Sequence, residues 1–146
     1  MRTIIMGSDH AGYALKQELS GQLSEQGYRV VDVGCHGTDS VDYPDFARAL
    51  ANEVLAGETS GILICGTGIG MSIAANKVAG IRAALCRDEF EAQMSRNHNN
   101  ANVLCLGARV LDTEAAARVV DRFLNSAFEG GRHARRVDKL ESRDPA

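Results

Sequence analysis

The sequence has no hydrophobic run that approaches the roughly 20 residues needed to cross a membrane. It also has no excess of basic residues, since 16 lysines and arginines stand against 19 aspartates and glutamates. The net charge of −3 argues against a nucleic-acid partner, and the missing apolar run argues against a membrane partner. The opening segment, residues 1–6, is too short for a signal peptide, so we expect a cytoplasmic protein.

Cysteine pairs with metal-binding spacing are also missing. The four cysteines, Cys35, Cys65, Cys86 and Cys105, do not recur at the short intervals of a zinc knuckle. A histidine follows Cys35, but the spacing around this pair does not resemble a zinc site. We therefore expect free thiols, with no metal and no cofactor.

Internal repeats, linkers and low-complexity segments are absent as well. With 146 residues and 45% hydrophobic side chains, the chain can bury a substantial core, and we expect one domain over residues 1–146. Strand and helix patterns alternate along it. The patterns predict strands at 3–7, 28–33, 61–65, 81–86 and 102–106. They predict a first helix that carries Leu15, Leu19 and Leu23, then helices at 44–54, 71–78, 88–96, 113–128 and 132–140. This alternation predicts an α/β fold, a Rossmann-like doubly wound sheet of five parallel strands with flanking helices and a C-terminal helix.

The most informative stretch is residues 61–72, where an apolar strand runs into a loop with glycine at every second position. The third glycine comes one position too early for a dinucleotide-binding loop, and the Gly-Lys-Ser/Thr of a Walker loop is missing. What remains is the Cys65 thiol, the Thr67 hydroxyl and backbone N–H groups at a helix start, a combination suited to an anionic ligand. Cys65 can act there as a base or nucleophile, and the alternative is a small buried hydrophobic side chain.

Ligands of parallel α/β sheets bind at the carboxyl ends of the strands. We expect that edge to carry Asp9, His10, Tyr43, Cys65, Thr67 and Arg109. Asp9 and His10 suggest acid–base chemistry beside the thiol, although Asp9 can instead cap the first helix.

Two further polar groups lie later in the chain. The run Asn97-His98-Asn99-Asn100 is rich in donors for sugar hydroxyls, but it also suits a helix C-cap and turn. Arg132 and Arg136 are four residues apart and share a helix face. Together with Arg109 they suit a phosphate, and the alternative is a solvated basic tail.

These motifs together resemble the ribose-5-phosphate isomerase type B family, which includes the galactose-6-phosphate isomerase subunits. The resemblance covers almost the whole chain, and its motifs are Gly7-Ser8-Asp9-His10-Ala11-Gly12, Asp42-Tyr43-Pro44, Cys65-Gly66-Thr67-Gly68-Ile69-Gly70, Ala74-Ala75-Asn76-Lys77, Asn97-His98-Asn99, Gly107-Ala108-Arg109 and Glu129-Gly130-Gly131-Arg132-His133.

The resemblance implies a metal-free aldose–ketose isomerase that interconverts ribose 5-phosphate and ribulose 5-phosphate through an enediol. Cys65 would move the proton between C1 and C2, and His98 would open the furanose ring. Thr67 and the loop Gly66, Gly68, Ile69 and Gly70 would hold the enediolate oxygen. Asp9, His10, Tyr43 and Asn99 would hold the sugar, and Arg109, Arg132 and Arg136 the phosphate. Some family members use a glutamate near this loop as base, but no glutamate lies between Gly61 and Gly80 here.

The residues leave the exact substrate open. Related members act on five-, six- or four-carbon sugar phosphates, so galactose-6-phosphate, allose-6-phosphate or a tetrose phosphate are alternatives. A non-catalytic sugar-phosphate-binding module on the same fold is a second alternative. A thiol redox protein is disfavoured, because Cys65 has no second cysteine near it in sequence.

Topology also bears on the assembly. Cys65 ends a strand, whereas His98 follows a crossover helix that runs antiparallel to the strands. The two residues should therefore lie at opposite edges of the sheet, roughly 17 Å apart. If both are catalytic, the simplest arrangement is a homodimer with shared active sites, and a further pairing into a tetramer is left open.

Overall fold

The computed structural model describes residues 1–142 and contains one sheet of five parallel strands in the order β2-β1-β3-β5-β4. Its strands are β1 (Thr3–Ser8), β2 (Arg29–Asp32), β3 (Ser60–Cys65), β4 (Ala83–Leu85) and β5 (Val103–Gly107). Its helices are α1 (Tyr13–Glu25), α2 (Tyr43–Gly57), α3 (Ile69–Asn76), α4 (Glu89–Asn97), α5 (Thr113–Leu124) and α6 (Arg132–Glu141). The predicted doubly wound α/β fold is therefore confirmed, while residues 143–146 of the expected domain lie outside the described part.

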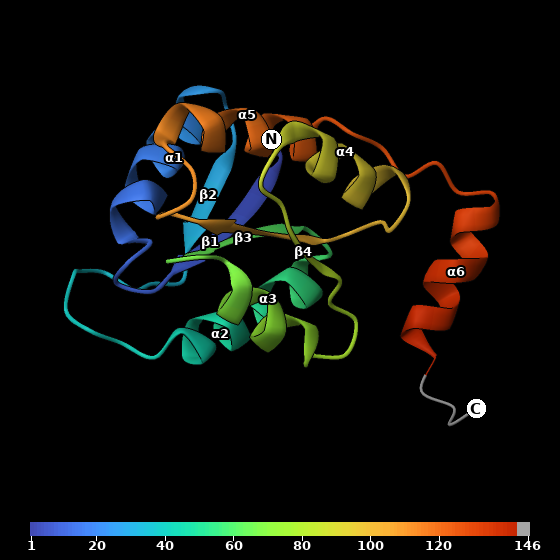
Figure 1. Cartoon of the computed structure of the whole chain (residues 1–146), viewed down its shortest axis with the longest axis horizontal. Helices are drawn as coiled ribbons and strands as arrows, with labels where there is room; N and C mark the ends of the chain where they lie inside the picture. Colours follow the sequence, from blue (N-terminus) through green and yellow to red (C-terminus); the bar gives the residue numbers. More distant parts are fainter. Residues whose placement is uncertain (143–146) are drawn as a thin grey trace.

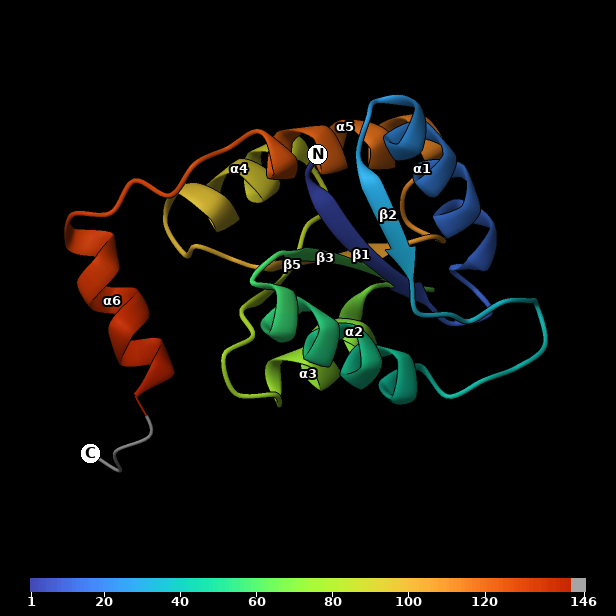
Figure 2. The same ribbon diagram turned by 180° about the vertical axis from the view of Figure 1, so that it is seen from behind.

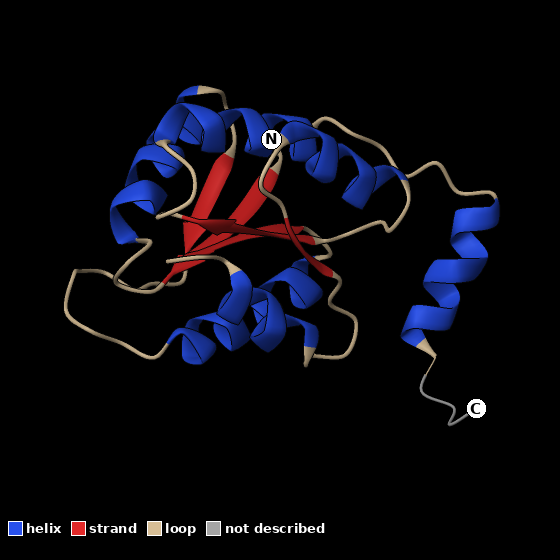
Figure 3. Ribbon diagram, in the orientation of Figure 1, coloured by secondary structure: helices blue, strands red, loops and turns tan. Residues whose placement is uncertain are grey.

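Helices cover both faces of the sheet. Helices α1, α4 and α5 lie on one face and α2 and α3 on the other, as Figure 1 and the reverse view in Figure 2 show. Helix α6 stands apart from the sheet beyond α4, and a tan connection joins it to α5 in Figure 3. The sheet thus carries the core, and α6 is left with much of its surface uncovered by its own chain.

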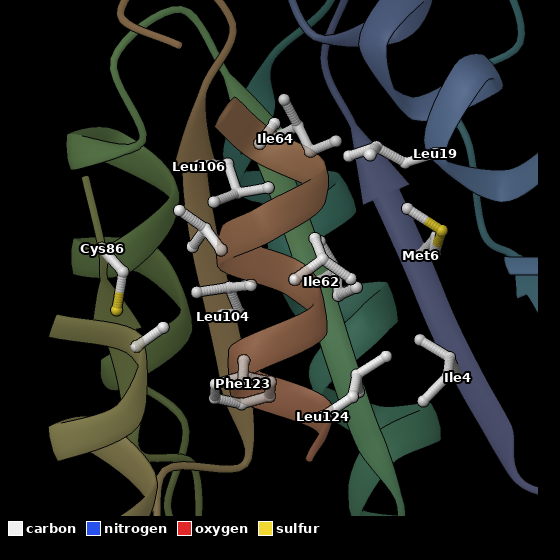
Figure 4. Close-up of a cluster of buried hydrophobic side chains, with 14 of the residues drawn as sticks. Ile4, Met6, Leu19, Ile62, Ile64, Cys86, Leu104, Leu106, Phe123 and Leu124 are labelled. Carbon is white, nitrogen blue, oxygen red and sulfur yellow. The ribbon is translucent and has the colours of Figure 1, made fainter. Parts of the chain in front are cut away.

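Alternating side chains of the three central strands fill the two layers. Ile4, Met6, Ile62, Ile64, Leu104 and Leu106 face α1 and α5, where Phe123 and Leu124 pack on them (Figure 4). Ile5, Leu63, Cys65, Val103 and Cys105 face α2 and α3. All of these side chains are buried, as expected for parallel strands covered on both faces. The Cys65 side chain therefore lies on the α3 side of the sheet.

Several predicted boundaries differ from those of the structure. The strand expected at 81–86 spans only Ala83–Leu85. The Asn102 amide oxygen accepts the Arg82 N–H at 2.8 Å, and the Asn76 side chain bonds both backbone groups of Ala83, at 2.8 and 2.9 Å. The side-chain amides thus hydrogen-bond to backbone groups that would pair with a neighbouring strand if β4 were longer. The third helix accordingly ends at Asn76 and not at Val78.

The helix expected at 113–128 ends at Leu124. The chain then runs along the end of α4, where the Asn97 amide donates to the Ala127 carbonyl at 2.7 Å. The Glu129 N–H donates to the Asn97 carbonyl at 3.0 Å. These two bonds carry the connection past α4 and bring the start of α6 beside His98. Separately, no helix within residues 1–142 is long and apolar enough to cross a membrane.

Candidate active site

The thiol of Cys65 lies where β3 ends and the glycine loop begins. Its sulfur accepts a hydrogen bond from the Gly68 N–H at 3.1 Å. Gly68 adopts φ +83°, a conformation that favours glycine, and this turn brings its N–H back toward the sulfur. The next N–H, that of Ile69, donates to the Thr67 hydroxyl oxygen at 3.2 Å. The loop thus joins a thiol, a hydroxyl and the start of α3 within a few residues.

Tyr43 and Arg109 lie directly on this loop. A Cβ atom added to Gly70 would lie 2.6 Å from the Tyr43 ring, and one added to Gly66 would lie 3.1 Å from Arg109 Nη1. The Arg109 N–H also donates to the Gly66 carbonyl at 2.9 Å. A larger residue at Gly70 would therefore displace the Tyr43 ring, and one at Gly66 would crowd the Arg109 guanidinium.

Asp9 and His10 complete the carboxyl edge. The Asp9 N–H donates to the Ile64 carbonyl at 3.2 Å, which places the turn after β1 against the end of β3. The Asp9 carboxylate accepts the Gly12 N–H at 3.0 Å, so it stabilises the turn before α1, but it does not cap the helix, whose N-cap is Gly12 without a side-chain cap bond. His10 Nδ1 accepts the Val41 N–H at 3.2 Å. The structure thus brings all six residues predicted at this edge together.

His98, Asn99, Arg132 and Arg136 form a separate group. His98 is the C-cap of α4, and a cavity of about 300 Å³ is lined by His98, Asn99, His133, Arg136, Val137 and Leu140. Arg132 is exposed at the first position of α6. The Asn97–Asn100 run is therefore both a helix end, as its alternative interpretation held, and one wall of a polar cavity.

The two groups lie at opposite edges of the sheet. The Asn99 carbonyl accepts the Arg82 guanidinium at 3.2 Å, and Arg82 directly precedes β4. The Asn102 carbonyl accepts the N–H of Gly61 near the start of β3. Cys65, by contrast, pairs with Gly107 at the end of β5. The length of β5 separates the edges, about 13 Å for four steps along a strand.

Two residues that the sequence analysis did not assign to the site join His98. The His133 ring stacks on His98 with centroids 4.2 Å apart, and Glu129 Oε1 lies 3.5 Å from His98 Nε2 and 3.8 Å from His133 Nε2. Burial lowers the pKa of His133, and the neighbouring charges of His98, Arg132 and Arg136 lower it further against the opposing effect of Glu129. The only sequence signal was the four-residue spacing of Glu129 and His133 within one motif.

The ligand atoms of His98, Glu129 and His133 lie within 4.8 Å of one another, a separation that a metal site could also have. The two imidazole planes are inclined by only 10°, so their in-plane lone pairs run nearly parallel and do not converge on one ion. The arrangement suits proton exchange between imidazoles and a carboxylate better than metal coordination.

The other three cysteines are buried. Burial raises the pKa of Cys86 to about 12 and also raises that of Cys105. These thiols are protonated at neutral pH, and Cys35 is buried as well. Of the four, Cys65 is the one that the glycine loop contacts through a backbone N–H.

Comparison with known proteins agrees with this arrangement. Residues 4–140 match the family model described as Ribose/Galactose Isomerase. The chain is 48% identical over 141 residues to ribose-5-phosphate isomerase B of Escherichia coli, covering 96% of this chain and 95% of that one. Ribose-5-phosphate isomerase B of Clostridium thermocellum superposes with a TM-score of 0.94 at 54% identity over 95% of each chain. Ribose-5-phosphate isomerase B of Mycoplasma genitalium, solved with bound ribulose-5-phosphate, superposes with a TM-score of 0.92 at 46% identity. The match covers 95% of this chain and 93% of that one. With this fold, this glycine loop and a family match over nearly its whole length, the chain belongs to the ribose/galactose isomerase family.

Proposed function

We propose that the protein is an aldose–ketose isomerase that interconverts ribose 5-phosphate and ribulose 5-phosphate. The observation that carries the proposal is the contact between the Cys65 sulfur and the Gly68 N–H, at the start of a helix and beside the Thr67 hydroxyl. Abstracting a proton next to a carbonyl requires a base and preorganised donors at the carbonyl oxygen. One short loop supplies both.

Each loop group then has a defined role. The Gly68 N–H donates to the Cys65 sulfur and orients it, and this sulfur takes the proton from C2 of the open aldose and returns it to C1. Thr67 Oγ1 already accepts the Ile69 N–H, so its own O–H proton is available to the enediolate oxygen. The N–H of Gly70 lies in the first turn of α3, where negative charge is favoured, and the N–H of Gly66 lies earlier in the loop.

Asp9, His10, Tyr43 and Arg109 surround the loop and would hold the sugar and its phosphate. Arg109 contacts Gly66, and Tyr43 contacts Gly70, so both reach the ends of the same loop. Holding the sugar from several sides positions C1 and C2 against the thiol, and such positioning contributes much of the rate gain in proton transfers.

The ring-opening group and two phosphate-binding arginines come from a second subunit in this proposal. The amino edge of the sheet carries His98, Asn99, Arg132 and Arg136. Their distance from Cys65 of the same chain supports a dimer in which they reach the Cys65 of the partner subunit. Two further features support a homodimer. Ile69 and Ile73 on α3 are 52% and 57% exposed. A cavity of about 480 Å³ separates α6 from the segment around β4. A tetramer would pair two such dimers without changing the sites.

The test is an assay of purified protein with ribose 5-phosphate in buffer containing a metal chelator. We expect ribulose 5-phosphate to form, and Cys65→Ala to bind the sugar phosphate without turning it over. Binding without turnover by the unsubstituted protein would contradict the proposal and favour a sugar-phosphate-binding module.

The family description names two sugars, which makes galactose 6-phosphate a second candidate substrate. Ribose, galactose, allose and tetrose phosphates all present a phosphate and an aldehyde to the same groups. A comparison of kcat/KM across these four substrates decides among them, and we expect the highest value for ribose 5-phosphate.

A further inference from the structure

Lys16 is fully buried in α1, among the largest side chains with no exposed surface. Burying an ammonium group removes its hydration, which is unfavourable unless paired groups replace the lost water. Lys16 Nζ lies 2.7 Å from Asp32 Oδ1 and 2.5 Å from the Cys35 carbonyl oxygen. The Tyr13 ring lies 5.5 Å from the same nitrogen. No residue assigned to the proposed site contacts this ammonium within residues 1–142.

Both partners of Lys16 hold the first part of the connection between β2 and α2, residues 33–42. Asp32 Oδ1 also accepts the Gly34 N–H at 2.8 Å. Cys35 donates its N–H to the Ser8 carbonyl, and Ser8 donates its N–H to the Gly34 carbonyl, at 2.8 and 2.7 Å. The long connection in Figure 1 is thus bound near its start to the end of β1, and the Lys16 ammonium binds the same segment through Asp32 and the Cys35 carbonyl.

The far part of the same connection contacts His10. The Val41 N–H donates to His10 Nδ1 at 3.2 Å. A backbone N–H can only donate, so this nitrogen must carry the lone pair and neutral His10 must carry its proton on Nε2. His10 consequently presents an N–H donor on the side of the ring that is free of Val41.

We propose that Lys16 is a positioning residue that acts through residues 33–42 to hold His10 in its Nε2–H tautomer. The inference rests on the proposed function in one respect, the role of His10 in holding the sugar phosphate. Lys16 holds the start of the connection in place through Asp32 and Cys35. The connection in turn positions the Val41 N–H, and this N–H selects the tautomer of His10. A lysine that only stabilised the fold would leave the proton of His10 where it is.

Two variants test the two ends of this chain of contacts. Lys16→Met together with Asp32→Asn removes both charges of the ion pair and keeps a side-chain oxygen that can accept the Gly34 N–H. Val41→Pro removes the N–H that His10 accepts, places the proline ring there instead, and leaves the ion pair in place. Gln17→Met is the matched control, because it puts the same residue at an exposed position of the same helix. Thermal unfolding establishes that each variant is folded.

The first readout is independent of catalysis. Nitrogen-15 NMR of the imidazoles should show His10 as the Nε2–H tautomer in the unsubstituted protein and in the control. Both test variants should show a mixture of tautomers. If either folded variant keeps a pure Nε2–H tautomer, the proposal is overturned. Should the double variant not fold, Lys16→Met alone is measured by the same criterion, since Asp32 is partly open to solvent.

The second readout links the tautomer to the site. We expect KM for ribose 5-phosphate to rise about tenfold in both test variants, the loss of one hydrogen bond to a charged group, with kcat changed far less. An unchanged KM beside a mixed tautomer would also overturn the positioning role. A tautomer change in a protein that never turns over ribose 5-phosphate would instead refute the proposed function and leave the link from Lys16 to His10 standing.

Discussion

The imidazole rings of His98 and His133 stack at 4.2 Å with their planes inclined by 10°. Two imidazolium cations at this separation repel each other, so the pair favours one proton at most. His133 is the more buried partner, and burial together with His98, Arg132 and Arg136 lowers its pKa. The neutral form of His133 is therefore favoured in the folded state.

This pKa shift predicts how stability depends on pH. Unfolded His133 takes up a proton near its ordinary pKa of about 6.5, but folded His133 resists protonation until a lower pH. Over that interval the unfolded state binds more protons, so the free energy of unfolding falls as pH falls below about 6.5. We expect His133→Phe, which keeps a stacked ring, to show a smaller loss of stability between about pH 7.5 and about pH 5.5. Urea unfolding at one protein concentration measures it, and equal losses in both proteins would contradict the assignment.

Replacing the proposed base should abolish turnover without abolishing binding. We expect Cys65→Ala to reduce kcat by roughly 10²- to 10⁴-fold, the usual contribution of a general base. Calorimetric titration with ribose 5-phosphate should still detect binding. Cys86→Ala is the control, since burial keeps this thiol protonated with a pKa of about 12. Near-normal turnover by Cys65→Ala would mean that the base lies elsewhere.

The arginines of α6 should recognise the phosphate and not the sugar. We expect Arg132→Ala and Arg136→Ala each to raise KM for ribose 5-phosphate about tenfold or more, with a much smaller effect on unphosphorylated ribose. Arg135→Ala changes the charge of the same helix at another exposed position and serves as control. Equal effects on both sugars would return Arg132 and Arg136 to the solvated-tail interpretation.

Subunit mixing tests the shared site. Cys65→Ala and His98→Ala variants should each be nearly inactive, because each lacks one group in both sites of its dimer. In a mixed dimer, one site carries both substitutions and the other carries neither. Random exchange should therefore restore about a quarter of the original activity. Native mass spectrometry verifies that exchange occurred, and if mixed dimers form without activity the cross-subunit arrangement is wrong.

Much of the fold and half of the proposed site could be predicted from local sequence pattern. Apolar runs such as Ile62–Ile64 report burial on both faces of a parallel sheet, and parallel strands place their carboxyl ends at one edge. That rule alone predicts that Asp9, His10 and Cys65 lie at the same edge of the sheet.

The remainder depends on tertiary contacts that no local pattern encodes. Glu129 and His133 reach His98 because Asn97 binds the passing backbone of Ala127 and Glu129. Lys16 follows Leu15 on α1, and its place in the sequence resembles that of a surface lysine. Its burial is explained by the ion pair with Asp32 and the hydrogen bond to the Cys35 carbonyl. The short β4 likewise reflects the side-chain amides of Asn76 and Asn102.

The same Asn76 amide has a consequence for how copies of the protein can meet. β2 and β4 are the outer strands of the sheet, with four and three residues. Short edge strands offer little template for another strand, and Asn76 already occupies both backbone groups of Ala83. A neighbouring chain therefore finds few backbone groups to extend the sheet at β4. Crowding should favour closed assemblies held by helix faces over ribbon-like growth into fibrils.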